Sequence, residues 1–314
     1  METEVIEWLL DGDPAICYQT RRDLLGEDGG SASMRAWQAR IATEGWGKAF
    51  LDAQNPDGSW ARGFYQPKWT STHYTLLDLR LLEAPRTLEA CRIAINDIAA
   101  KHKSEDGGIN PAGTIKEADV CINGMFMTYG CYFGIDAAAL GSVVDFVLSQ
   151  QLPDGGWNCR YNRSGARHSS MHSTLSVLEG IAEYIRRGYS YRGPELEAAA
   201  DAGRGFLLMH RLYKSDRTGQ VIHPSFLTFA FPPRWKYNVL RALDYFRLVS
   251  APWDDRMSHA VAVVKSKRKP DGRWPVQAAH PGQVHFVMEK GRSPSRWNTL
   301  IALRVLKHDS DDAA

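Results

Sequence analysis

Apolar side chains recur at helical spacing in segments that end in a turn signal. Residues 142–150 carry four of them on one face of a 3.6-residue period: Val143, Val144, Val147 and Leu148. A Pro-Asp-Gly string follows at 153–155, where proline restricts the backbone and glycine accepts the positive φ that ends a helix. No strand-like alternation interrupts these segments, so the pattern predicts an all-α fold.

The turn string recurs along the chain. QNPDGSW at 54–60 returns as QLPDGGW at 151–157 and as KPDGRW at 269–274, and weaker echoes lie at 105–108 and 217–220. The copies are spaced by about fifty residues, a period typical of helix-pair repeats. The tryptophans at 60, 157 and 274 are predicted to be structural, packing one repeat on the next.

The segments after the turns also resemble one another. The string that begins at His73 resembles the one at His172, the string at Tyr237 resembles the one at Trp297, and by analogy Asn123 opens the helix between the two histidine copies. Serine or threonine just upstream can cap each start. The chain is therefore predicted to be one domain, 1–314, made of about six helix pairs. We place these pairs at 1–46, 47–97, 98–143, 144–195, 196–250 and 251–314.

Composition and charge narrow the classes of function. The 314 residues are 44% hydrophobic and 24% charged, which provides for a buried core, and the net charge is +2. Because Lys and Arg are scattered among nearly as many Asp and Glu, no nucleic acid or anionic membrane partner is expected. The acidic N-terminus is unlike a signal peptide, and no window approaches the roughly 20 apolar residues of a transmembrane segment. We expect a cytoplasmic protein.

The chain has five cysteines at irregular spacing: Cys17, Cys91, Cys121, Cys131 and Cys159. An odd number without a pattern argues against a disulfide framework and favours reduced thiols. One of these thiols is a candidate metal ligand.

The Gln-x-x-Asp-Gly-x-Trp strings resemble the turn motif of squalene and oxidosqualene cyclases. The whole chain resembles the α/α-toroid superfamily, which also includes the β-subunits of protein prenyltransferases, and looks like a bacterial-type squalene-cyclase-like member. This resemblance implies a single (α/α)6 toroid in which the second helix of each pair lines a central apolar funnel. A hydrophobic small molecule is then the expected substrate, whereas a protein partner is not specified.

A carboxylate, a thiol and an imidazole form the sharpest candidate site. Asp119 and Cys121 precede or open one inner helix and His172 opens the next, and three such ligands leave the fourth position of zinc open for water or substrate. The alternative reading of these residues is a helix cap at Asp119 and a small buried cysteine. The set is similar to the Asp-x-Cys and His of prenyltransferase β-subunits, and this resemblance implies Zn2+ activating an acceptor thiol.

The match to that family departs at the diphosphate site. Lys116 stands where the family has a lysine, but Gly113 replaces its arginine and Ile122 replaces its tyrosine. A prenyl diphosphate needs several cations and hydroxyls, so these departures argue against a literal protein prenyltransferase.

The cyclase resemblance departs at a different point, because the Asp-x-Asp-Asp acid of class II terpene cyclases does not occur. The nearest string, 253–256, is interpreted as a helix cap.

Several further residues are candidates for a pocket. His73 and Tyr237 are candidate catalytic groups, with a satisfied core histidine and core packing as the alternatives. Six residues near inner-helix starts and in the loop before the last helix are candidate pocket residues: Trp69, Lys116, Asn123, Trp235, His285 and Trp297.

Three functions stay open at this point. The first is a zinc-dependent enzyme acting on a hydrophobic, isoprenoid-type substrate. The second is a metal-free, squalene-type terpene cyclase, and the third is a non-catalytic toroid that binds a lipid or a partner.

Overall fold

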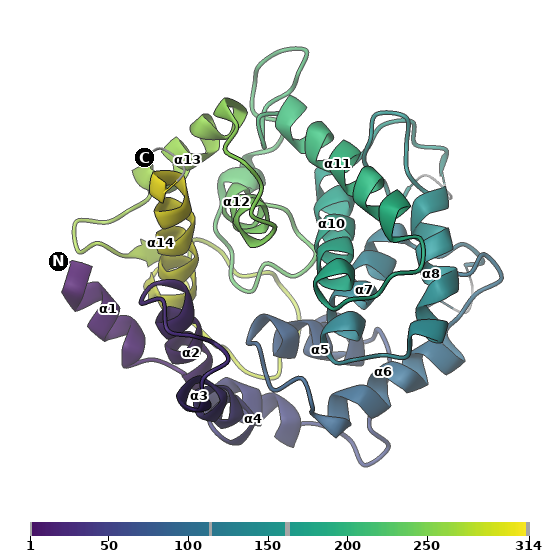
Figure 1. Cartoon of the computed structure of the whole chain (residues 1–314), viewed down its shortest axis with the longest axis horizontal. Coiled ribbons are helices and arrows are strands. Elements are labelled where there is room, and N and C mark those ends of the chain that lie inside the picture. The colour runs from purple at the N-terminus through teal and green to yellow at the C-terminus, as the bar shows by residue number, and fades with distance from the viewer. Residues whose placement is uncertain (1, 113–114, 161–163, 312–314) are drawn as a thin grey trace. The chain divides into compact units, whose positions relative to one another are not determined.

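The computed structural model describes residues 2–112, 115–160 and 164–311, and within them nearly all of the regular secondary structure is helical (Figure 1). This confirms the predicted all-α class. The chain divides into two compact units, which are described separately. Unit 1 comprises Met1–Ala53, Leu81–Pro85 and His210–Ala314, and unit 2 comprises Gln54–Arg80 and Arg86–Met209. The single toroid with a central funnel stays a prediction.

Unit 2 holds three helices that correspond to the predicted second helices of the pairs, for which we keep the name inner helices, together with further helices before, between and after them. The inner helices are α5 (Thr72–Leu81), α7 (Val120–Tyr132) and α10 (Met171–Arg186). The others are α6 (Glu89–Lys101), α8 (Ala137–Ser149), α11 (Gly193–Met209) and the short η1 (Lys68–Thr70).

Helices α7 and α10 pack directly against each other because glycine lies at their contact. A Cβ atom at Gly124 would lie 2.5 Å from the carbonyl oxygen of Ser176, closer than packed atoms approach. The two helices therefore come close enough for side chains at their first turns to be neighbours.

The turn strings are fastened to the inner helices by one recurring hydrogen bond. The backbone N–H groups of Trp60, Trp157 and Trp274 each donate to a threonine hydroxyl at an inner-helix start, at 2.9, 3.0 and 3.0 Å. The acceptors are Thr72, Thr174 and Thr299. All three indole rings are fully buried, which agrees with their predicted structural role.

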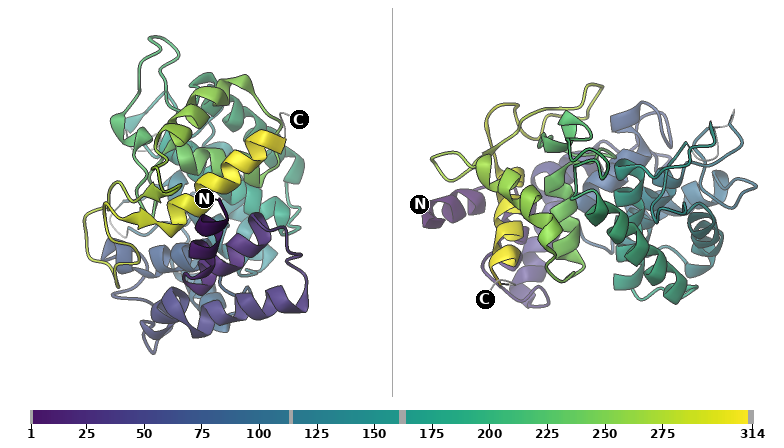
Figure 2. Two further views of the ribbon diagram at one scale, coloured as in Figure 1. Left: turned by 90° about the vertical axis from the view of Figure 1, so that its left-hand side faces the viewer. Right: turned by 90° about the horizontal axis from the view of Figure 1, so that it is seen from above.

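Unit 1 repeats the same local organisation with α2 (Pro14–Asp23), α12 (Val239–Leu248) and α14 (Arg296–Asp311) as inner helices. Helix α14 lies between the other two in Figures 1 and 2, in agreement with its contacts. The buried guanidinium of Arg304 joins the three helices by pairing with Asp23 and Asp244, and it also donates to Gln19. The remaining helices of the unit are α1 (Glu2–Leu10), α3 (Ala32–Thr43), α4 (Gly45–Asp52), α13 (Ser258–Ser266), η2 (Pro224–Leu227) and η3 (Asp255–Met257).

Some local predictions are confirmed and others need correction. The carboxylate of Asp254 accepts from the N–H of Arg256 at 2.8 Å, which is the cap predicted for this string. Helix α7 begins at Val120, so Asn123 lies in its first turn rather than at its start. A two-residue antiparallel pair, β1 (Trp274–Pro275) with β2 (Pro294–Ser295), was not predicted, because two residues are too few to show an alternation. No helix of the described residues is long and apolar enough to cross a membrane.

Candidate functional site

The centre of the candidate site is His73, the second residue of α5. Its side chain has no exposed surface, and its Nδ1 lies 3.0 Å from the hydroxyl of Tyr129 on α7. Its Nε2 is buried and has no hydrogen-bond partner among the described residues. An unsatisfied buried nitrogen costs stability, so its retention is a reason to look for a functional role.

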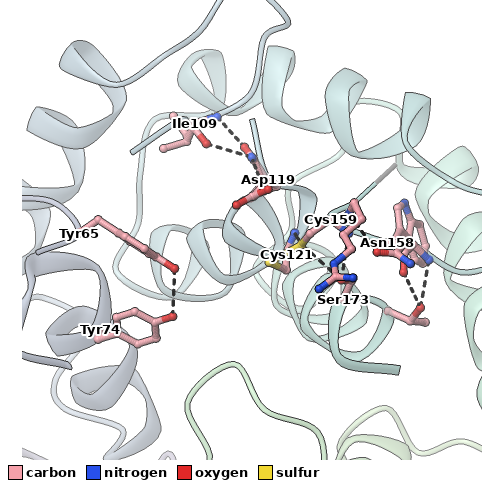
Figure 3. The surroundings of a disulfide bond; sticks show 12 residues. Tyr65, Tyr74, Ile109, Asp119, Cys121, Asn158, Cys159 and Ser173 are labelled. Carbon is pink, nitrogen blue, oxygen red and sulfur yellow. Dashed lines mark hydrogen bonds between the residues drawn. A yellow bond between two sulfur atoms is a disulfide. The ribbon is translucent and has the colours of Figure 1, made fainter. Parts of the chain in front are cut away.

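Four aromatic rings surround this imidazole, and we call them the His73 cage. Phe64, Tyr65, Tyr74 and Tyr129 have ring centroids 5.6, 5.4, 4.9 and 5.4 Å from that of His73. Phe64, Tyr74 and Tyr129 are buried, whereas Tyr65 is half-buried and forms the outer wall. The hydroxyls of Tyr65 and Tyr74 lie 3.3 Å apart. Figure 3 marks this hydrogen bond with a dashed line.

Burial keeps the imidazole neutral. Desolvation, together with a smaller contribution from the nearby ammonium of Lys68, lowers the pKa of His73 to about 3. Burial also raises the pKa of Tyr129 well above its usual value, so the phenol keeps its proton. The pair is therefore neutral.

A further aromatic ring packs against the cage. Trp69 is buried, and its ring packs edge-on against Tyr74 with the centroids 4.8 Å apart. The ammonium of Lys68 lies 5.2 Å from the ring centroid of Trp69 and 5.9 Å from that of Tyr65. The ring faces of Tyr65 and Trp69 therefore stabilise a positive charge at this distance.

The predicted zinc ligands lie at the starts of α7 and α10, as the sequence implied. Asp119 is the N-cap residue of α7, but its side chain makes no capping hydrogen bond. His172 is the second residue of α10 and is half-buried. Cys121, the second residue of α7, forms a disulfide with Cys159 (Figure 3). The expectation of reduced thiols is therefore wrong for this pair, whereas Cys17, Cys91 and Cys131 are free and buried.

The donor set does not fit a zinc ion in this state. A cysteine ligates zinc as a thiolate, and the sulfur of Cys121 is bonded to another sulfur. Within the described ranges, no three side chains of His, Cys, Asp or Glu are arranged to hold a metal ion. The zinc site stays a prediction.

Two other predicted pocket residues of unit 2 have different surroundings. Asn123 is buried, and its amide is bonded to the backbone: it accepts from the N–H of Ile109 at 2.7 Å and donates to the carbonyls of Ile109 and Asp119. These bonds fasten the turn to α7. Lys116 is exposed and borders a surface cavity of about 430 Å3.

The predicted residues of unit 1 form a separate set. Tyr237 is buried and donates from its hydroxyl to the carbonyl of Leu212 at 2.5 Å, and burial raises its pKa well above the usual value. Trp297 is buried with its ring stacked between Trp46 and Phe231, at centroid distances of 6.2 and 5.2 Å.

The two remaining predicted residues of unit 1 are Trp235 and His285. Trp235 is half-buried under the ammonium of Lys236, and the ring of His285 packs edge-on against Phe50. Their roles as pocket residues stay predictions.

Sequence reasoning missed the partners of His73 and of Cys121. Tyr129 lies two helical turns after Cys121, and Phe64 and Tyr65 lie in the loop before α5, where no motif marks them. Cys159 follows the recurring turn string at 151–157 by two residues. A repeat-based comparison could have placed that position beside the next inner-helix start, but a residue type alone does not reveal the contact.

Part of the chain is similar to a known terpene cyclase. The chain is similar to α-onocerin synthase LCD of Lycopodium clavatum, with 26% identity over 188 residues, 52% of this chain and 23% of that enzyme. The chain thus spans about a quarter of the relative it matches. This similarity to a terpene cyclase supports the terpene-cyclase-like resemblance.

Two further comparisons add less. No protein-family profile matches the chain. A protein from Actinoplanes of known structure aligns with 94% of this chain and 89% of its own, at 14% identity and a TM-score of 0.48.

Proposed function

We propose that this chain binds a hydrophobic, isoprenoid-type molecule and catalyses a terpene-cyclase-like reaction in which His73 takes the proton that ends a carbocation rearrangement. The observation that carries the proposal is the neutral, fully buried imidazole of His73 inside four aromatic rings, with Nε2 unpaired in the described structure. The similarity to α-onocerin synthase supports the same class of chemistry.

The hydrogen bond to Tyr129 determines which nitrogen of His73 can accept a proton. When Nδ1–H donates to the hydroxyl of Tyr129, the lone pair of Nε2 is available to accept a proton. Loss of a proton from the carbon next to the cation then forms an alkene and leaves an imidazolium. A carbocation is a far stronger acid than an imidazolium whose pKa is about 3, so the transfer is favourable even to this weakened base.

The His73 cage serves this step in two ways. Ring faces stabilise positive charge close to them, as the position of Lys68 over Tyr65 and Trp69 illustrates. Buried rings also exclude water, which would capture the cation as an alcohol. Because Tyr65 is the half-buried member of the cage, we propose that the substrate reaches Nε2 past this side chain.

Product analysis tests the proposal. Purified protein is incubated with squalene, with 2,3-oxidosqualene and with prenyl diphosphates of several lengths, and the extracts are searched for cyclic hydrocarbons and alcohols. We expect a cyclic product from at least one substrate, and His73→Gln to lower its yield roughly 100-fold or more, which is the usual contribution of a positioned acid or base. His168→Gln, a change at an exposed histidine of the same unit, should leave the yield unchanged.

Two outcomes would overturn the assignment. If no substrate gives a cyclic product, the cyclase activity is refuted, and a co-purifying lipid without turnover would favour the non-catalytic binding function. If cyclic product forms equally well in His73→Gln, another group takes the proton.

The zinc-dependent function is a second candidate, for the reduced chain. It is motivated by the placement of Asp119, Cys121 and His172 at the starts of two directly packed helices. Gly113 and Ile122, the two positions that depart from the prenyltransferase pattern, add no support for this function. Gly113 lies outside the described residues, and Ile122 is buried. Metal analysis after anaerobic reduction tests it. Stoichiometric zinc that is lost in Cys121→Ala would support this function, and its absence from the reduced wild type would exclude it.

A further inference from the structure

The Cys121–Cys159 disulfide joins two segments that approach the same helix starts. Cys121 belongs to the first turn of α7, and Cys159 lies between the turn at 151–157 and the start of α10. Both cysteines are half-buried and are not enclosed in the protein interior. The bond therefore links the start of one inner helix to the segment that leads into the next.

The two sulfur atoms have different surroundings. The sulfur of Cys159 accepts hydrogen bonds from the N–H of Cys121 at 3.2 Å and from the hydroxyl of Ser173 at 3.3 Å. The N–H of Cys159 in turn donates to Ser173 at 3.2 Å. Both donors to the sulfur belong to the first turns of helices, where the backbone dipole favours negative charge. Negative charge on the sulfur of Cys159 is thus stabilised from two sides.

The other cysteines lack these features. Burial raises the pKa of all three remaining thiols. It raises the pKa of Cys91 to about 12 and that of Cys131 well above its usual value, and it also raises the pKa of Cys17. These thiols are buried in the protein interior, where they are inert. They provide internal controls within one molecule.

We propose that Cys121 and Cys159 form a thiol–disulfide exchange site, in which a low-molecular-weight thiol attacks the sulfur of Cys121 and Cys159 is the leaving group. The attack forms a mixed disulfide on Cys121, and the electron pair of the broken bond stays on the sulfur of Cys159. A second thiol then releases Cys121. Overall two thiols are oxidised to one disulfide, and the protein disulfide gains two electrons and two protons.

The direction of attack follows from the leaving group. Exchange is faster when the departing sulfur is the better stabilised thiolate, and the hydrogen bonds from Cys121 N–H and Ser173 converge on Cys159. Reduction would unlink the start of α7 from the segment before α10 and would free the thiol of Cys121. The site does not depend on the proposed cyclase activity, and it is tested without a cyclase assay.

Mass spectrometry locates the mixed disulfide. The purified chain is treated with reduced glutathione under anaerobic conditions and quenched with acid. The tryptic peptide 117–160, which contains both sulfurs, is then fragmented. We expect glutathione mainly on Cys121 in the wild type. In Cys159→Ser, oxidised glutathione should modify Cys121 and the adduct should persist, because no second cysteine resolves it. Glutathione mainly on Cys159, or a wild-type chain that forms no disulfide when treated with oxidised glutathione, would overturn the proposal.

Substitution of Ser173 tests the leaving-group argument. Ser173→Ala removes one hydrogen bond to the sulfur of Cys159, and we expect reduction to slow roughly three- to tenfold. Ser173→Thr keeps the hydroxyl and should keep the rate. Ser170→Ala is a matched control, because the Ser170 side chain makes no capping hydrogen bond at the start of α10. Equal rates in Ser173→Ala and the wild type would refute the stabilisation of Cys159.

Discussion

The unfolding free energy should depend on pH in a way that reveals whether burial keeps the imidazole of His73 neutral. In the unfolded chain this group titrates near 6.5, whereas burial lowers its pKa to about 3 in the folded protein. The folded pKa is the lower one, so the unfolded state binds the extra proton. The stability contributed by the neutral ring is therefore fully present above pH 6.5 and is lost as the pH falls toward 3.

The size of the effect follows from the two pKa values. At pH 7 the unfolded chain gains only about 0.2 kcal/mol from protonating this group, whereas at pH 5 it gains about 2 kcal/mol, while the folded ring stays neutral. His73→Gln removes the titration and keeps a side chain that can bond to Tyr129. The difference in unfolding free energy between wild type and variant should thus shift by about 2 kcal/mol between pH 7 and pH 5.

Urea unfolding followed by tryptophan fluorescence at both pH values measures this shift. His168→Gln changes an exposed side chain and serves as the control. Its unfolding free energy should follow the same pH profile as that of the wild type. If His73→Gln also gives a parallel profile, the imidazole is not held neutral by burial, and the argument for its role as a proton acceptor is refuted.

Three further substitutions test the packing around the site. Glu183→Gln removes a buried carboxylate whose pKa is lowered to about 2 by Arg80 and Arg187. It should cost about 3 kcal/mol in urea unfolding at pH 7, and the loss should shrink as the pH falls from 4.5 toward 2; a pH-independent cost would contradict this. Gly124→Ala should lower stability by about 1–3 kcal/mol despite the better helix propensity of alanine, because its Cβ would meet the backbone of α10. Gly141→Ala in the open part of α8 should be neutral or stabilising, and equal effects would refute the close approach. Thr174→Val leaves the N–H of Trp157 without its acceptor and should cost about 1–3 kcal/mol, and an unchanged melting curve would show that this bond is dispensable.

The sequence predicted local features well because they depend on neighbours in the chain. The helical period, the Asp-Gly turns and the helix starts at His73, His172 and Trp297 all follow from residues a few positions apart. The burial of the three turn tryptophans was predicted as well. Helix boundaries shifted by up to three residues, as at Asn123, because tertiary hydrogen bonds decide where the first turn begins.

The candidate site needed contacts that the sequence pattern does not contain. The neutrality of His73 depends on Tyr129, 56 residues away, and on rings from the loop before α5. The state of Cys121 depends on Cys159, 38 residues away. A residue type indicates which chemistry is available, so the sequence by itself determined an all-α chain with candidate histidines and thiols near helix starts, and the repeat of helix pairs stays a prediction. Only the tertiary structure decided which of these groups are desolvated, paired or bonded, because burial and distance between separate segments set the pKa and the reactivity of each side chain.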